Sequence, residues 1–154
     1  MIFAESKITK IALPFFTSVS YYYMMISMNG VKKTTEEWLK QADYDLKTAK
    51  AMLLARKYIY TIFMCHLAVE KTLKALWTKK YSEAPGKTHD LIFLSSGLEL
   101  NLTTKLSDFL EELNGLSVPT RYPDELDKVL KQFSLAKTEK IYKSTKELLS
   151  WLKK

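Results

Sequence analysis

The stretch His66-Leu-Ala-Val-Glu70-Lys71-Thr-Leu-Lys74-Ala-Leu76 combines an apolar helical face with a polar row. It lies within residues 58–80, where apolar side chains recur at the three- and four-residue spacing of one helix face. These apolar residues are Ile59, Ile62, Val69, Leu73 and Leu76. His66, Glu70 and Lys74 are four residues apart and are therefore neighbours on that helix. Each four-residue step rotates about 40° around the helix axis, so we expect the row to climb from His66 in the core to Lys74 at the surface.

Further helices are predicted on both sides of residues 58–80. A helix over residues 34–57 is indicated by an N-cap at Thr34 or Thr35 and by acidic Glu36 and Glu37 in its first turn. Its apolar face is formed by Trp38, Ala42, Leu46, Ala49 and Leu53. A third helix is expected to begin at His89 with Thr88 as its cap, and a fourth after Asn101 or Thr103. The last covers residues 134–152, with Ile141, Thr145, Leu148, Leu149 and Leu152 facing inward.

The segments between these helices have turn composition. A Pro-Gly pair at residues 85–86 predicts a loop, and two prolines within residues 118–124 predict a non-helical segment. Alternating runs of strand type are absent from the sequence. The predicted fold class is therefore all-α, an up-and-down bundle of four to five helices over residues 34–154.

Residues 1–33 do not share the helical pattern and are predicted to be an irregular leader. Pro14 interrupts the apolar run of residues 11–26, which is too short and too polar for a membrane span of about 20 apolar residues. Met24, Met25 and Met28 offer alternative starts. We therefore expect the folded protein to begin near Met28 and the leader to be absent from the native product, and we expect no membrane association.

The positive charge is concentrated at the carboxyl end of the chain. The net charge is +7, and residues 128–154 carry eight lysines against two glutamates. Such a concentration is either an electrostatic footprint for phosphates or a solvated helix face.

Cysteine and histidine are scarce, which limits the chemistry available. The single cysteine, Cys65, cannot form an internal disulfide, and this favours a cytoplasmic location. With two histidines and no carboxylates at ligand spacing, no metal site is predicted. Because no glycine-rich phosphate loop is present, no cofactor is predicted either.

Four motifs follow one another in the sequence in a recognisable order. They are Trp38-x-x-x-Ala42-x-x-Asp45-Leu46-x-x-Ala49, then His66-Leu-Ala-Val-Glu70-Lys71-x-x-Lys74-Ala-Leu76, then Thr88-His89-Asp90-Leu91, and finally Arg121-Tyr122-Pro123. Together they resemble the HEPN domain, a family named for its occurrence in higher eukaryotes and prokaryotes and for nucleotide binding. The resemblance covers about residues 34–152.

The resemblance implies an α-helical bundle that is usually dimeric and often encoded beside a small nucleotidyltransferase. It also implies nucleotide binding and, in many branches, metal-independent RNA cleavage. The ribonuclease branches have an arginine followed four to six residues later by a histidine, whereas no histidine follows Arg121 here. We therefore assign no catalytic residue.

Three residues in the later motifs are candidate ligand-binding residues. The guanidinium of Arg121 suits bidentate phosphate recognition, although an ion pair with Asp124 or Glu70 is the alternative. His89 can donate to a phosphate at a helix N-terminus or simply open that helix. Tyr122 can stack on a base or anchor its loop.

The polar row adds His66, Glu70 and Lys74 to the candidate site. In the functional interpretation Lys74 binds phosphate and Glu70 orients Arg121 or Lys74. In the structural interpretation Glu70 and Lys74 form a helical ion pair, worth about 0.3 kcal/mol when exposed. His66 either lines the cleft or is a core histidine with its hydrogen bonds satisfied.

Three functions are compatible with these residues. The preferred one is a HEPN-type module that recognises nucleotide or RNA phosphate, as a homodimer and with a separate nucleotidyltransferase in a toxin–antitoxin-like pair. The second is a ribonuclease toxin that uses Arg121 with His66 or His89. The third is a purely structural bundle in which the polar row gives specificity to dimerisation.

Overall fold

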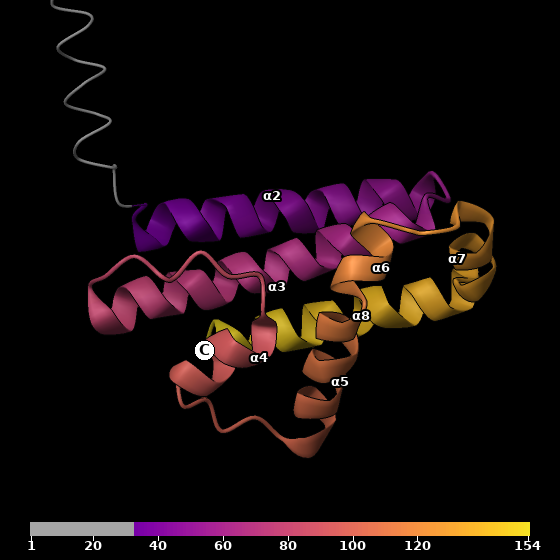
Figure 1. Ribbon diagram of the computed structural model, residues 1–154. Coiled ribbons are helices and arrows are strands. Elements are labelled where there is room, and N and C mark those ends of the chain that lie inside the picture. The colour runs from indigo at the N-terminus through magenta and orange to yellow at the C-terminus, as the bar shows by residue number, and fades with distance from the viewer. Residues whose placement is uncertain (1–32) are drawn as a thin grey trace, which may run out of the picture. The chain divides into compact units, whose positions relative to one another are not determined.

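The computed structural model describes residues 33–154, and these form helices without a strand. The helices are α2 (Thr35–Leu54), α3 (Tyr58–Tyr81), α4 (Leu91–Gly97), α5 (Thr104–Gly115), α6 (Ser117–Arg121), α7 (Leu126–Gln132) and α8 (Leu135–Leu152) (Figure 1). The prediction of an all-α bundle is confirmed. The predicted leader and the proposed start near Met28 fall outside the described residues, except for Lys33.

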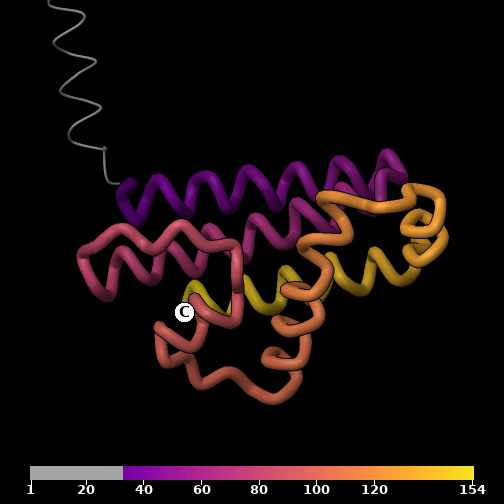
Figure 2. Tube along the Cα trace, in the orientation of Figure 1, coloured from indigo at the N-terminus to yellow at the C-terminus, as the bar shows by residue number. Residues whose placement is uncertain are grey.

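Helix α3 is the centre of the bundle, because it packs against each of the other six described helices. It pairs along its length with α2, and α8 packs beside it (Figure 1). The small residues Ala42 and Ala49 of α2 are buried and allow close approach to α3. The segment between α3 and α4 runs back along α3 before α4 begins (Figure 2).

The predicted helix boundaries hold for the long helices. Thr34 caps α2, since its hydroxyl oxygen accepts a hydrogen bond of 3.2 Å from the Glu37 amide. After α2 the chain turns at Arg56, whose φ is +58°, and α3 starts two residues later. Ser134 caps α8 in the same way. All five residues predicted to face inward from α8 are buried.

The prediction that residues 118–124 are not helical is wrong for the first half of that segment. Pro119 is the third residue of α6, a position where a helix leaves its backbone N–H without an internal partner. A proline there removes no helical hydrogen bond. Helix α6 follows α5 almost directly, and the short helix α7 comes after it. Neither short helix was predicted, so the described bundle has seven helices rather than four to five.

The start of the third predicted helix also differs from the expectation. Asp90, not Thr88, is the N-cap of α4, because its carboxylate accepts from the amides of Ile92 at 2.9 Å and Phe93 at 3.0 Å. His89 therefore precedes the helix instead of opening it. Thr88 still acts locally, since its hydroxyl oxygen accepts from the Asp90 amide.

In the described part of the chain no helix is long and apolar enough to cross a bilayer. Likewise, residues 33–154 contain no group of three or more histidine, cysteine, aspartate or glutamate residues placed to hold a metal ion.

Candidate functional site

Glu70, near the middle of α3, is the centre of a polar cluster that joins α3 to the segment before α4. Its Oε1 lies 2.7 Å from Lys74 Nζ, and its Oε2 lies 2.9 Å from His89 Nδ1. The Nε2 atom of His66 is 3.6 Å from the same Oε2. We call these four residues the Glu70 cluster. The structure thus brings together four of the six residues that the sequence pointed to.

The expected climb of the polar row to the surface is wrong. His66, Glu70 and Lys74 are all buried, with exposed fractions of 0%, 4% and 7%. Neighbouring segments cause this burial: α2 covers Lys74, whereas the end of α5 and the segment before α4 lie against His66 and Glu70. The Lys74 ammonium lies 5.5 Å from the centre of the Trp38 ring of α2.

His66 is fully buried and has a carbonyl oxygen near each ring nitrogen. Its Nδ1 is 3.4 Å from the Leu113 oxygen at the end of α5, and its Nε2 is 3.1 Å from the His89 oxygen. Asn114, next to Leu113, accepts a 2.9 Å hydrogen bond from the Leu91 amide. These contacts hold the end of α5 and the start of α4 against α3. Neither the role of Leu113 nor that of Asn114 has a signal in the sequence.

His89 is the member of the Glu70 cluster that reaches solvent, with 60% of its side chain exposed. The carboxylate of Glu70 holds the ring at Nδ1. Since the two ring nitrogens act separately, Nε2 is left for a second partner. The Nδ1 side of the His89 ring is thus held by Glu70, while the Nε2 side is left for a partner outside the cluster.

Glu70 remains ionised across the ordinary pH range. Burial alone would raise the pKa of this carboxyl, but hydrogen bonds with His66, Lys74 and His89, together with the charge of Lys74, lower it to about 2. The cluster is therefore built around a charged, paired carboxylate, which is how buried charges are tolerated.

Arg121 lies apart from the Glu70 cluster. It is the last residue of α6, and its guanidinium carbon is 5.0 Å from the centre of the Phe63 ring of α3. Within residues 33–154 its Nε is buried without a hydrogen-bond partner, and it forms no ion pair with Asp124 or Glu70. Tyr122 follows it with 71% of its surface exposed. The importance of Phe63 was missed, because its apolar side chain looks like any other in the sequence.

Arg121 lies near Phe63 and His89 contacts Glu70, so the spacing of Phe63 and Glu70 on α3 indicates how far apart the two candidate residues are held. Phe63 and Glu70 are seven residues apart, which is about two turns and about 10 Å along the axis, on nearly the same helix face. The Arg121 guanidinium and the His89 ring are thus held from one side of α3 at two separate points.

Comparison with known proteins agrees with the helical fold. The sequence model of the HEPN domain matches residues 35–154. The fold is similar to that of TT1696 from Thermus thermophilus, with 22% identity, a TM-score of 0.69, and coverage of 77% of this chain and 95% of that one. It is also similar to ST0689, an archaeal HEPN homologue, with 24% identity, a TM-score of 0.63, and coverage of 79% and 96%.

A search of curated proteins finds no significant match. The two structural likenesses show the fold alone, whereas the family match extends over the whole bundle. It begins at the first residue of α2 and runs to Lys154. This chain therefore belongs to the HEPN domain family.

Proposed function

We propose that this HEPN domain is a binding module that recognises the phosphate of a nucleotide or RNA through Arg121 and His89. The observation that carries the proposal is the outward imidazole of His89, held at Nδ1 by the buried carboxylate of Glu70. The carboxylate accepts from Nδ1–H, so the ring in its imidazolium form is pre-organised to donate from Nε2 to an anion. Arg121 adds a guanidinium whose central carbon lies 5.0 Å from the centre of the Phe63 ring, and a guanidinium can bind an anion through two N–H groups at once.

The remaining candidate residues take supporting roles in this proposal. Lys74 and Glu70 neutralise each other at 2.7 Å, and Lys74 is buried, so Lys74 serves to hold Glu70 rather than to bind phosphate. Glu70 orients His89 instead of Arg121. Tyr122 is the candidate for stacking on a base, because it is exposed and adjacent to Arg121.

A binding role is better supported than ribonuclease activity. General acid–base catalysis needs a group that reaches the substrate, and His66 is fully buried with its nitrogens beside backbone carbonyls. His89 is then the single accessible histidine near the site. Incubation with labelled RNA tests this directly, since cleavage that His89→Gln abolishes would favour the ribonuclease.

The proposal includes a homodimer. Six of the ten large apolar side chains exposed in the described part lie at the end of α2, in the first turn of α3, on α6 and α7, and at the start of α8: Leu54, Tyr60, Val118, Leu126, Leu130 and Leu135. Such a concentration is typical of an interaction surface. Sedimentation of the Leu126→Glu, Leu130→Glu double variant is expected to show a monomer where the unaltered protein is a dimer.

The proposal further includes a separate nucleotidyltransferase as partner, in a toxin–antitoxin-like pair in the cytoplasm. Support for the partner comes from the resemblance to HEPN domains. A reducing location agrees with Cys65, which is buried and whose pKa burial raises to about 12, so that this thiol is unreactive. Co-purification with the product of a neighbouring nucleotidyltransferase gene tests the pairing.

The phosphate site is tested by fluorescence anisotropy with a short single-stranded RNA and with AMP as probes. Arg121→Gln and His89→Gln are each expected to weaken binding about tenfold, the size of one charge-assisted hydrogen bond. Lys50→Gln is the matched control, because it removes an exposed charge from α2. Equal affinities in all four proteins would contradict the proposal.

A further inference from the structure

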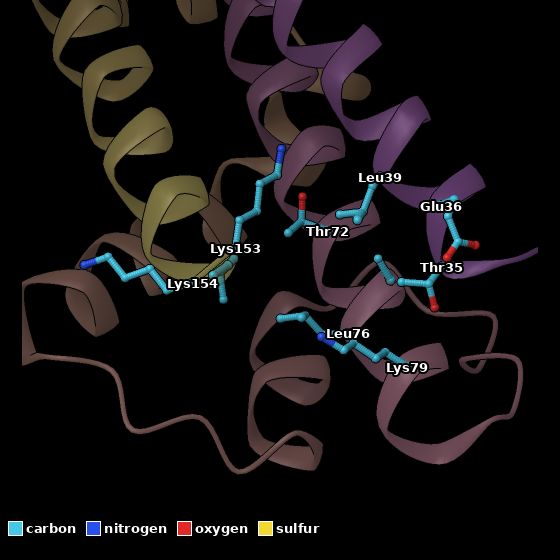
Figure 3. Close-up of a pocket in the computed structure, with 10 residues that line it drawn as sticks. Thr35, Glu36, Leu39, Thr72, Leu76, Lys79, Lys153 and Lys154 are labelled. Carbon is cyan, nitrogen blue, oxygen red and sulfur yellow. The ribbon is translucent and has the colours of Figure 1, made fainter.

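A cavity of about 430 Å³ lies at a different place in the bundle from the Glu70 cluster and Arg121. It is bounded by the start of α2, the second half of α3 and the end of α8 (Figure 3). None of the six site residues predicted from the sequence lines it. Its volume is within the range of small-molecule sites in proteins.

The wall of this cavity is aliphatic. Leu39 from α2, Leu76 from α3 and Leu152 from α8 contribute to it. Thr72 also lines the cavity, but its hydroxyl donates to the Ala68 carbonyl oxygen at 2.9 Å and is not free to donate to a ligand. Among residues 33–154, no aromatic side chain lines it. Because bases are recognised by stacking and by hydrogen bonds to their edges, this wall suits a hydrocarbon chain and not a nucleobase.

The rim of the cavity is cationic. Lys79, Lys153 and Lys154 stand there against one acid, Glu36. Lys153 is paired with Asp43, with its Nζ 2.6 Å from Asp43 Oδ1, whereas no ion pair among residues 33–154 involves Lys79. Figure 3 shows the Lys79 side chain reaching toward Leu76, while the side chains of Lys153 and Lys154 extend away from the centre.

Glu36 determines at which end of the cavity an acid group can lie. A backbone hydrogen bond and the Thr34 hydroxyl lower the pKa of Glu36, so its charge is retained at the start of α2. An anion is therefore repelled from the α2 end and attracted to the side where Lys79 stands.

We propose that this cavity binds a small aliphatic anion, with its hydrocarbon chain against Leu39, Leu76 and Leu152 and its acid group beside Lys79. The shape and the charge of the lining are both needed for this assignment, since the wall provides apolar contact and the rim provides the positive charge. The site does not depend on phosphate recognition by Arg121 and His89.

Isothermal titration of the full-length protein with octanoate tests the proposal. Saturable binding of one octanoate per chain is expected, and hexanoate should bind about fourfold more weakly for each methylene removed from the buried chain. Lys79→Glu is expected to weaken octanoate binding about tenfold, as one favourable contact becomes a repulsion. Lys143→Glu is the matched control, because it makes the same charge change on the exposed face of α8 and should leave the affinity unchanged.

Two results would overturn the proposal. One is the absence of saturable octanoate binding up to about 1 mM, which corresponds to the weakest affinity of interest. The other is an equal effect of Lys79→Glu and Lys143→Glu, which would mean that octanoate follows the net charge alone. Leu76→Gln gives an independent check, because it should weaken octanoate binding without any change in charge. RNA affinity is expected to stay the same in Leu76→Gln, which separates this site from the phosphate site.

Discussion

Two ion pairs of nearly the same length stand in opposite surroundings. Lys74 and Glu70 are 2.7 Å apart within α3, with side chains 9% and 5% exposed. Lys105 and Glu147 are 2.6 Å apart and connect α5 to α8, with side chains 70% and 50% exposed. Distance alone makes them equivalent, whereas burial makes the first a fixed part of the core and leaves the second a solvated contact. The comparison teaches that the environment of a charge decides its role in this bundle.

The largest effect is expected from Glu70→Ala. It leaves the Lys74 ammonium buried without its partner and frees His89, so we expect a loss of about 3 kcal/mol in the free energy of unfolding. Chemical denaturation followed by circular dichroism measures the loss. A change below about 1 kcal/mol would mean that the buried pair behaves like a surface pair.

The pH dependence of the same carboxylate is the next largest effect. The pKa of Glu70 is lowered from 4.5 to about 2, so its ionised form stabilises the fold fully above pH 4.5 and loses this effect as the pH falls toward 2. The shift corresponds to about 3 kcal/mol. The stability difference between the unaltered protein and Glu70→Gln should therefore shrink between pH 5 and pH 2. A difference that stays constant over this interval would contradict the lowered pKa.

His89→Gln is expected to have a smaller effect on stability than on binding. Because His89 is 60% exposed, loss of its contact with Glu70 should cost only about 1 kcal/mol. Thermal melting and RNA anisotropy on the same sample measure the two effects together. A severe loss of stability would show that His89 belongs to the core of the Glu70 cluster rather than to its outer edge.

The exposed pair should show the smallest effect. A double-mutant cycle with Lys105→Ala and Glu147→Ala is expected to give a coupling energy below about 1 kcal/mol, which falls further as salt screens the charges. The decrease of the coupling energy with added salt is the more decisive measurement of the two. A coupling that is insensitive to salt would place this pair in the same class as Glu70 and Lys74.

The helices that the sequence predicts well are those with both a capping residue and an apolar period. Thr34 and Ser134 mark the starts of α2 and α8, and the inward face of α8 follows directly from its spacing. Helix α6 was missed because proline usually ends a helix, and Pro119 sits in the first turn where that rule does not apply.

The candidate site was harder to predict than the fold. Spacing within one helix correctly joined His66, Glu70 and Lys74, but it placed Lys74 at the surface, because the coverage by Trp38 of α2 is a tertiary effect. The contact between Glu70 and His89 spans 19 residues and depends on the path of the segment before α4. The position of the Arg121 guanidinium near the Phe63 ring depends likewise on where α6 packs.

The most direct test of the account is the salt dependence of RNA binding in Arg121→Gln. If Arg121 contacts a phosphate, the slope of log affinity against log salt for single-stranded RNA should become shallower by about 0.7, the value for one phosphate contact. The affinity at low salt should also fall about tenfold, while Lys50→Gln keeps the slope of the unaltered protein. A slope and an affinity for Arg121→Gln equal to those of Lys50→Gln would contradict phosphate recognition by Arg121.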